Sequence, residues 1–154
     1  MNRAAIQKAF EEHLKKAGLK LTPQRGRIFD RAFDTHDHFS AEQLYEWLKA
    51  EDGEGASRAT VYRTLGMLTE GGFLESLDAG KGELLYEHVL GHSHHDHMVC
   101  TSCGRIEEFH EPRIEELQEA TAERLGFRLT SHSMRLFGVC PSCDRGANRS
   151  GKGE

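Results

Sequence analysis

The ten residues from His94 to Cys103 carry the side chains that proteins use most often to bind transition metals. They read HHDHMVCTSC and supply three imidazoles, one carboxylate and a Cys-x-x-Cys pair. Thiolates are soft ligands, whereas imidazoles and carboxylates are harder, so the two halves of the stretch suit different metal sites. Side chains alternate between two faces in an extended segment. We therefore expect His95 and His97 to face one site, and His94 and Asp96 to face another.

Four cysteines form two Cys-x-x-Cys pairs, and this spacing predicts a structural zinc site. The pairs are Cys100 with Cys103 and Cys140 with Cys143. Four thiolates complete a tetrahedral Zn2+ site that has no open position for a substrate and that contributes directly to folding. The alternative is a dithiol redox site, which requires its cysteines to open a helix near a βαβ unit. The polar residues after Cys143 do not suit that context.

Composition and charge narrow the class of protein. The chain has 154 residues, enough for one domain or two small ones, and two small domains would need a metal or a partner subunit for stability. The formal net charge of -5 argues against bulk coating of nucleic acid, although residues 1–31 hold eight Lys or Arg against three acids. Neither a membrane-spanning run nor a signal-peptide pattern is visible. We expect a cytoplasmic protein without a membrane partner.

The first half of the chain predicts helices followed by a β-hairpin. Apolar periodicity and capping signals indicate four helices, of which two end at Gly18 and near Asp34, a third begins after the Ser40 capping box and a fourth is capped by Ser57. The apolar runs 73–77 and 83–90 then flank a turn. This order is typical of a winged helix-turn-helix. An ordinary small helical domain with a hairpin is the alternative.

The fourth predicted helix, SRATVYRTLGML, has two unlike faces. Its apolar face consists of Val61, Leu65 and Leu68. Its other face consists of Ala59, Tyr62, Arg63 and Gly66, and therefore carries small side chains apart from one aromatic ring and one cation. A glycine inside a helix costs about 1 kcal/mol relative to alanine, a loss that is easier to understand if a partner must approach the backbone closely. A DNA groove is one such partner.

The second half of the chain predicts a smaller α/β unit. Residues 97–100 and 105–109 are short strands, Pro112 opens a helix that Gly126 closes, and residues 127–139 suit a strand pair. The predicted fold class is therefore α+β. We divide the chain into a winged-helix DNA-binding domain at 1–88, a metal-binding and dimerisation domain at 89–145, and a disordered tail at 146–154.

Six motifs in one order make the chain resemble the ferric uptake regulator family of metal-responsive repressors. The motifs are LKLTPQR at 19–25, SAEQLY at 40–45, ATVYR at 59–63, HHDH at 94–97, the two Cys-x-x-Cys pairs, and LTSHS at 129–133. The resemblance extends from about residue 18 to residue 143. It implies an N-terminal winged helix for DNA, a C-terminal α/β dimerisation domain and a metal site at the hinge between them.

The resemblance also implies metal ligands. A regulatory site would use His38, Glu87, His95 and His97, with Glu108 as a fifth candidate and His88 as a rival ligand. A second site would use His94, Asp96, Glu115 and His132. To DNA contacts we assign Lys20, Arg25, Arg58, Thr60, Tyr62 and Arg63.

These observations predict a homodimeric, metal-dependent transcriptional repressor that senses iron, with Fe2+ as corepressor and no enzymatic activity. The expected partner is double-stranded operator DNA, palindromic and AT-rich. The HHDH string and the glutamates at 87 and 108 resemble the iron branch, although Mn2+ or Zn2+ could fill the same ligands. A zinc-, manganese- or peroxide-sensing member of the family, a zinc-stabilised interaction module and a metal-dependent hydrolase are the alternatives. The hydrolase lacks a catalytic spacing such as His-Glu-x-x-His.

Overall fold

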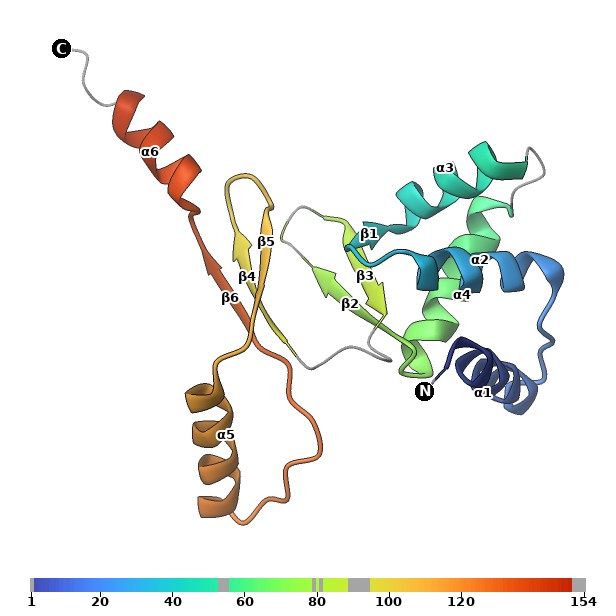
Figure 1. Ribbon diagram of the computed structural model, residues 1–154, viewed down its shortest axis with the longest axis horizontal. Coiled ribbons are helices and arrows are strands. Elements are labelled where there is room, and N and C mark those ends of the chain that lie inside the picture. Colours follow the sequence, from blue (N-terminus) through green and yellow to red (C-terminus); the bar gives the residue numbers. More distant parts are fainter. Residues whose placement is uncertain (1, 53–55, 79, 81, 89–94, 151–154) are drawn as a thin grey trace. The chain divides into compact units, whose positions relative to one another are not determined.

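The computed structural model divides the chain into two compact units, residues 1–93 and residues 94–154. It describes residues 2–52, 56–78, 80, 82–88 and 95–150. Each unit has its own three-stranded sheet, and helices dominate the first unit (Figure 1). Within these ranges, no helix is long and apolar enough to cross a bilayer.

The first unit is a helical domain closed by a small antiparallel sheet. Its helices are α1 (Arg3–Lys16), α2 (Pro23–Asp34), α3 (Ala41–Asp52) and α4 (Arg58–Glu70). Its strands are β1 (Phe39–Ser40), β2 (Leu74–Asp78) and β3 (Leu84–His88), in the order β1-β3-β2. The predicted helices and the β2–β3 hairpin are confirmed. The two-residue strand β1 was not predicted.

The start of α3 is fixed by the predicted capping box. The backbone N–H of Ser40 donates to Oε1 of Gln43 at 2.8 Å, and the backbone N–H of Gln43 donates to Oγ of Ser40 at 3.1 Å. Ser40 also belongs to β1, where it pairs with Leu85 of β3. The cap therefore fastens α3 to the sheet, and it holds the residues just before β1 next to the end of β3.

An aromatic core holds the first unit together. Phe10, Phe29 and Phe39 are fully buried, and the Phe10 ring lies 5.8 Å from that of Phe29 between ring centroids. On α4, Val61 and Leu65 are fully buried, as the predicted apolar face requires. Burial of this stripe fixes the rotation of α4 about its axis, so the opposite face of the helix is directed to solvent.

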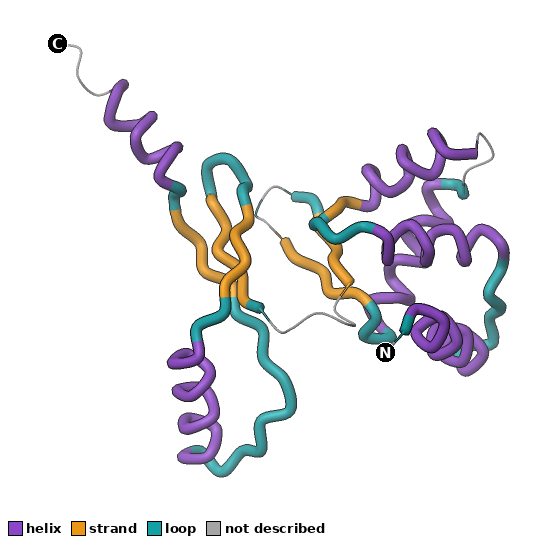
Figure 2. The backbone as a smooth tube through the Cα atoms, viewed as in Figure 1, coloured by secondary structure: helices purple, strands orange, loops and turns teal. Residues whose placement is uncertain are grey.

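The second unit is organised around its central strand. The strands are β4 (Asp96–Cys100), β5 (Ile106–Phe109) and β6 (Arg135–Gly138), in the order β5-β4-β6, and the helices are α5 (Pro112–Arg124) and α6 (Pro141–Ser150). β4 is antiparallel to β5 and parallel to β6. A parallel pair needs a crossover, which α5 and a long return loop provide (Figure 2). The α5 and α6 helices lie at opposite ends of the sheet (Figure 1).

Two predictions for the second unit are wrong. Residues 127–139 do not form a strand pair, because only β6 is a strand there and residues 127–134 run back to the start of β6. A 13-residue helix is about 20 Å long, and about six extended residues are needed to return along it, so residues 127–134 are long enough. The disordered tail predicted at 146–154 is also wrong for residues 146–150, since α6 extends to Ser150; residues 151–154 lie outside the described residues. The helix starts inside the second cysteine pair, with a proline in its first turn.

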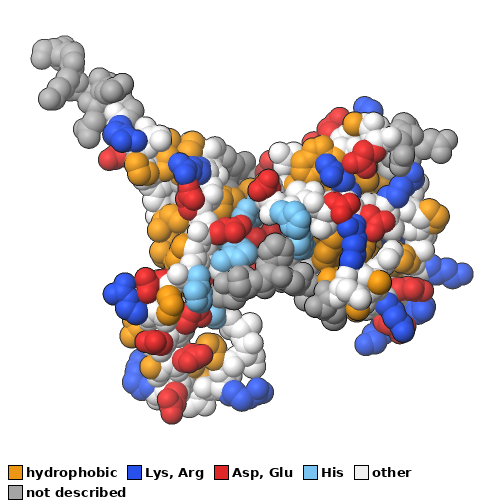
Figure 3. Space-filling model, viewed as in Figure 1, with side chains coloured by type: hydrophobic (Ala, Val, Ile, Leu, Met, Phe, Trp, Pro, Cys, Tyr) orange, Lys and Arg blue, Asp and Glu red, His pale blue; other side chains and the backbone are white. Residues whose placement is uncertain are grey.

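The apolar stripe of α5 is not buried within its own chain. Leu117 is 67% exposed, Leu125 is 59% exposed and Phe127 of the return loop is 73% exposed. These side chains border a groove of about 600 Å3. Hydrophobic side chains also reach the surface of this unit over its sheet (Figure 3). Because only Val99 and Cys100 are buried hydrophobic residues in the described part of this unit, it has little core of its own.

Gly66 inside α4 and Gly71 at its C-cap give a matched test of packing. A Cβ at Gly71 would overlap the Phe73 ring, which lies 5.5 Å from the Phe10 ring between centroids, whereas a Cβ at Gly66 would meet nothing within 4 Å. We predict that Gly71→Ala lowers the free energy of unfolding by about 1–3 kcal/mol through overpacking. Gly66→Ala should raise it by about 1 kcal/mol. Urea denaturation of both variants checks the pair, and a loss of stability in Gly66→Ala would contradict it.

Candidate metal centres and nucleic-acid interface

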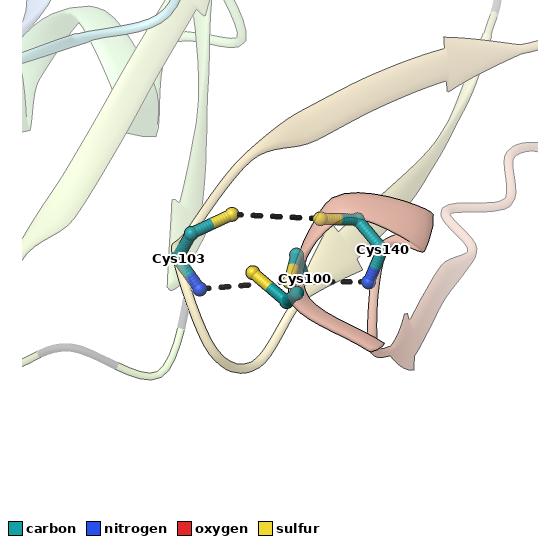
Figure 4. A group of neighbouring side chains, drawn as sticks. Cys100, Cys103 and Cys140 are labelled. Atoms are coloured by element: carbon teal, nitrogen blue, oxygen red, sulfur yellow. Dashed lines mark hydrogen bonds between the residues drawn. The ribbon is translucent and has the colours of Figure 1, made fainter. Parts of the chain in front are cut away.

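The four cysteines come together at one end of the central strand. Cys100 ends β4, Cys103 follows in a turn, and Cys140 and Cys143 flank the start of α6. The parallel register of β4 and β6 pairs Cys100 with Gly138, which brings the second cysteine pair to the first. All four sulfur atoms lie within 4.8 Å of one another, and the Sγ atoms of Cys103 and Cys140 are 3.8 Å apart (Figure 4).

The cysteine group suits a tetrahedral ion. Thiolates about 2.3 Å from Zn2+ in a tetrahedron lie about 3.8 Å from one another, as the Sγ atoms of Cys103 and Cys140 do. The backbone N–H groups of Cys103 and Cys140 donate to Sγ of Cys100 at 3.5 and 3.3 Å (Figure 4). These hydrogen bonds lower the pKa of the Cys100 thiol to about 5, so it is a thiolate at neutral pH.

A second group of candidate ligands lies near the opposite end of β4. Ligand atoms of Asp96, Glu115 and His132 all lie within 4.8 Å of one another. Nε2 of His132 is 3.0 Å from Oε2 of Glu115, and Asp96 is only 1% exposed. The fourth predicted member, His94, lies outside the described residues. His110, just before the α5 helix, lies beside this group, with its Nδ1 3.9 Å from Oε1 of Glu115.

The first unit brings together two of the predicted regulatory ligands. Nε2 of His38 lies 3.4 Å from Oε2 of Glu87. The sheet explains this contact, because Phe39 pairs with Tyr86 and their neighbours His38 and Glu87 are therefore adjacent. The rival ligand His88 packs elsewhere: its ring stacks on Phe33 at 5.3 Å between centroids, on the other face of β3 from Glu87.

The second unit brings together the other three predicted regulatory ligands. The rings of His95 and His97 are 5.2 Å apart between centroids, and Nε2 of His95 lies 3.6 Å from Oε1 of Glu108. His97 lies opposite Glu108 in the antiparallel register of β4 and β5. Alternation along β4 separates this group from Asp96, as expected from the sequence.

The α4 helix presents the predicted nucleic-acid face to solvent. Tyr62 is 52% exposed, and Arg63 is also exposed. Thr60 is half-buried, and its hydroxyl lies 2.9 Å from that of the N-cap residue Ser57, so this predicted contact residue belongs to the helix cap. Arg58, the first residue of α4, binds Glu42 of α3.

The two remaining predicted contacts lie where α2 begins. Lys20 is exposed in the loop before α2. Nη1 of Arg25 donates to the backbone carbonyl of Lys20 at 2.6 Å, which orders the loop against the first turn of the helix. The Arg25 side chain is thus held at the Lys20 backbone in the first unit.

Comparisons with known proteins agree with this arrangement. The model of the ferric uptake regulator family matches residues 16–137. The ferric uptake regulation protein of Neisseria meningitidis serogroup A is 41% identical over 138 residues, which cover 88% of this chain and 94% of that protein.

Solved structures give the same result. The ferric uptake regulator of Helicobacter pylori, described as having three functional metal binding sites, superposes with a TM-score of 0.80 at 30% identity over 94% of this chain and 95% of that one. The Pseudomonas aeruginosa regulator, solved with manganese, superposes with a TM-score of 0.72 at 32% identity over 84% of this chain and 96% of that one. This protein belongs to the ferric uptake regulator family of metal-responsive transcription regulators.

Proposed function

We propose that this protein is an iron-responsive transcriptional repressor, with Fe2+ as the corepressor that increases its affinity for operator DNA. The observation that carries the proposal is the sorting of ligands by type. The thiolates form one group, while imidazoles and carboxylates come together within each unit, as His38 with Glu87 and as His95, His97 and Glu108. A metal bound by the second kind of ligand can come and go while the cysteine group stays filled.

The proposed regulation is thermodynamic linkage. The regulatory ligands belong to both units, so a metal that binds all of them favours one arrangement of the units over others. If that arrangement suits two successive DNA half-sites, metal and DNA strengthen each other's binding by the same factor. Metal supplies only charge and coordination, and the Tyr62 and Arg63 side chains contact the DNA.

Iron is preferred over other metals because of the similarity to known proteins and not because of the ligand types. His95, His97, Glu87 and Glu108 are mixed imidazole and carboxylate donors, which suit Fe2+, Mn2+, Zn2+ and Co2+, and the Irving-Williams order does not select iron among them. The similarity to proteins named for ferric uptake regulation favours iron. The related structure with manganese keeps manganese sensing as the second candidate.

The cysteine group is proposed to hold one structural Zn2+ per chain, and the protein is proposed to act as a homodimer. Both proposals would explain how the second unit is stable although its own hydrophobic core is small. Zinc would join β4 to α6, and a second copy would cover the exposed Leu117, Leu125 and Phe127. A symmetric dimer would bind a palindromic site, for which we expect an AT-rich sequence and a cytoplasmic setting.

Loss of one thiolate tests the zinc proposal. Cys103→Ser should release zinc, reduce the dimer fraction and lower the melting temperature by roughly 10 °C, as a loss of about 2 kcal/mol does in a small domain. Elemental analysis, sedimentation and thermal unfolding measure these effects. Ser102→Ala, between the two cysteines, is the control and should keep its zinc. Full zinc content and an unchanged dimer in Cys103→Ser would show that the cysteines have another role.

Metal-by-metal titration tests the regulatory site. Fe2+ added without oxygen, Mn2+ or Zn2+ is titrated into protein with a labelled, palindromic, AT-rich duplex, and affinity is measured by anisotropy. A gain of about 100-fold corresponds to a coupling of roughly 2.7 kcal/mol. His95→Ala should abolish the gain but keep folding and zinc content, whereas His132→Ala should retain at least part of it. The opposite result would assign sensing to the second site.

Two substitutions test the DNA face. Arg63→Ala should relax the preference for the operator sequence, because contacts to base edges determine sequence specificity. It should weaken binding to the preferred duplex by about 1–3 kcal/mol. Lys20→Ala should weaken binding to all duplexes evenly and reduce the slope of log K against log salt by about 1. Competition between the preferred duplex and an unrelated one separates the two effects. Variants that both match the parent would argue against this face.

A further inference from the structure

Arg58 joins the start of α4 to the start of α3. Its Nε and Nη2 atoms lie 2.9 and 2.7 Å from Oε1 of Glu42, and Nη2 lies 3.7 Å from Oε1 of Glu46. Its guanidinium carbon lies 4.2 Å above the centre of the Tyr45 ring. These three partners are spaced i, i+3 and i+4, so one face of α3 holds the arginine.

Arg58 also belongs to the proposed DNA face. Arg58, Tyr62 and Gly66 follow one another at intervals of four residues and therefore form one stripe along α4. Tyr62 is half-exposed, and a Cβ at Gly66 would meet nothing within 4 Å, so the stripe is open. The arginine side chain can thus reach either α3 or a partner that lies along α4.

Helix stability does not explain a cation at this position. The first turn of a helix favours acids and disfavours cations, and the first turn of α4 has no acidic residue. The carboxylates of α3 compensate: hydrogen bonding to Arg58 lowers the pKa of Glu42, and the same bond raises the pKa of Arg58. Both groups therefore stay charged at any physiological pH.

The ion pair is open to solvent and therefore easy to exchange. The side chains of Arg58 and Glu42 are 57% and 41% exposed, and exposed pairs of this kind contribute little to stability. Within the described ranges, Nη1 of Arg58 has no hydrogen-bond partner, so the guanidinium has a donor to spare. A phosphate oxygen accepts from arginine with the same geometry as a carboxylate.

We propose that Arg58 is an exchangeable cation, bound to Glu42 and Glu46 in the DNA-free protein and to a backbone phosphodiester of DNA in the complex. The inference rests on the proposed use of α4 for DNA binding. Each binding event then breaks an intramolecular ion pair and leaves two carboxylates near the DNA. Glu42 therefore weakens binding to every duplex, and base contacts must compensate before the complex becomes stable.

A charge-removal series on the intact, metal-loaded protein tests the exchange. Affinity for the palindromic duplex and for an unrelated duplex is measured across a range of salt concentrations. Glu42→Gln should tighten both complexes by about 3- to 10-fold. Arg58→Ala should weaken both and reduce the salt slope by about 0.9 per chain, the value for one phosphate contact. In the Arg58→Ala background, Glu42→Gln should increase DNA affinity by less than half the factor that it gives in the parent protein.

Glu51→Gln is the matched control. It removes the same charge from the same helix, but Glu51 pairs with Arg31 of α2, with 3.1 Å between Nε and Oε1. A simple change of net charge would affect DNA binding equally in Glu51→Gln and Glu42→Gln, and that equality would overturn the exchange.

The outcomes also separate the exchange from the proposed function. If Arg58 only fastens α3 to α4, Glu42→Gln lowers affinity and Arg58→Ala leaves the salt slope unchanged; either result overturns the exchange. If Arg63→Ala still loses sequence preference, the proposed DNA face stands and the exchange alone fails. If Arg63→Ala matches the parent on both duplexes, α4 does not contact DNA and both proposals fail. Thermal unfolding of each variant confirms that the fold is kept.

Discussion

The pairing of β4 with strands on both sides is the constraint on which the second unit depends. As the central strand, β4 cannot shift its register without losing two sets of backbone hydrogen bonds. Alternation along it directs His97 and Asp96 to different ligand groups, and its last residue, Cys100, meets the cysteines at α6 through the parallel pairing with β6. One five-residue strand thereby supplies ligands to three groups without letting them mix.

Structural features that depend on a few contiguous residues could be predicted from the sequence. The Ser40 capping box, the β2–β3 hairpin and the spacing of the cysteine pairs are local signals, and each depends on a few neighbouring side chains. Strand β1 could not be found this way, because two residues carry no periodicity and their pairing with β3 is long-range. The prediction of disorder was wrong at 146–150 for a similar reason, since these residues continue a helix that begins at the second cysteine pair.

For the site residues too, the sequence shows the local pattern but not the distant partner. A stripe such as Leu117 and Leu125 indicates an apolar face, but the sequence does not say whether that face meets its own chain or another copy. Likewise, a cation at 58 suggests a nucleic-acid contact, whereas its carboxylate partner sixteen residues earlier is visible only in the fold. Partners separated in sequence depend on helix packing, and packing depends on the whole core rather than on local pattern.

A net charge of -5 is compatible with a role in DNA binding, because a regulator must bind its own sites without binding all DNA tightly. A repressor competes with a large excess of unrelated sites, so the ratio of specific to non-specific affinity matters more than either value. Uniform positive charge raises both affinities together and leaves the ratio unchanged. On the proposed use of α4 for DNA binding, the acids on α3 would act in the other direction, since they would lower the phosphate contribution and leave a larger share of the binding free energy to Tyr62 and Arg63. In the proposed linkage, metal would then decide whether the remaining contacts are sufficient, because no large non-specific affinity would mask its effect.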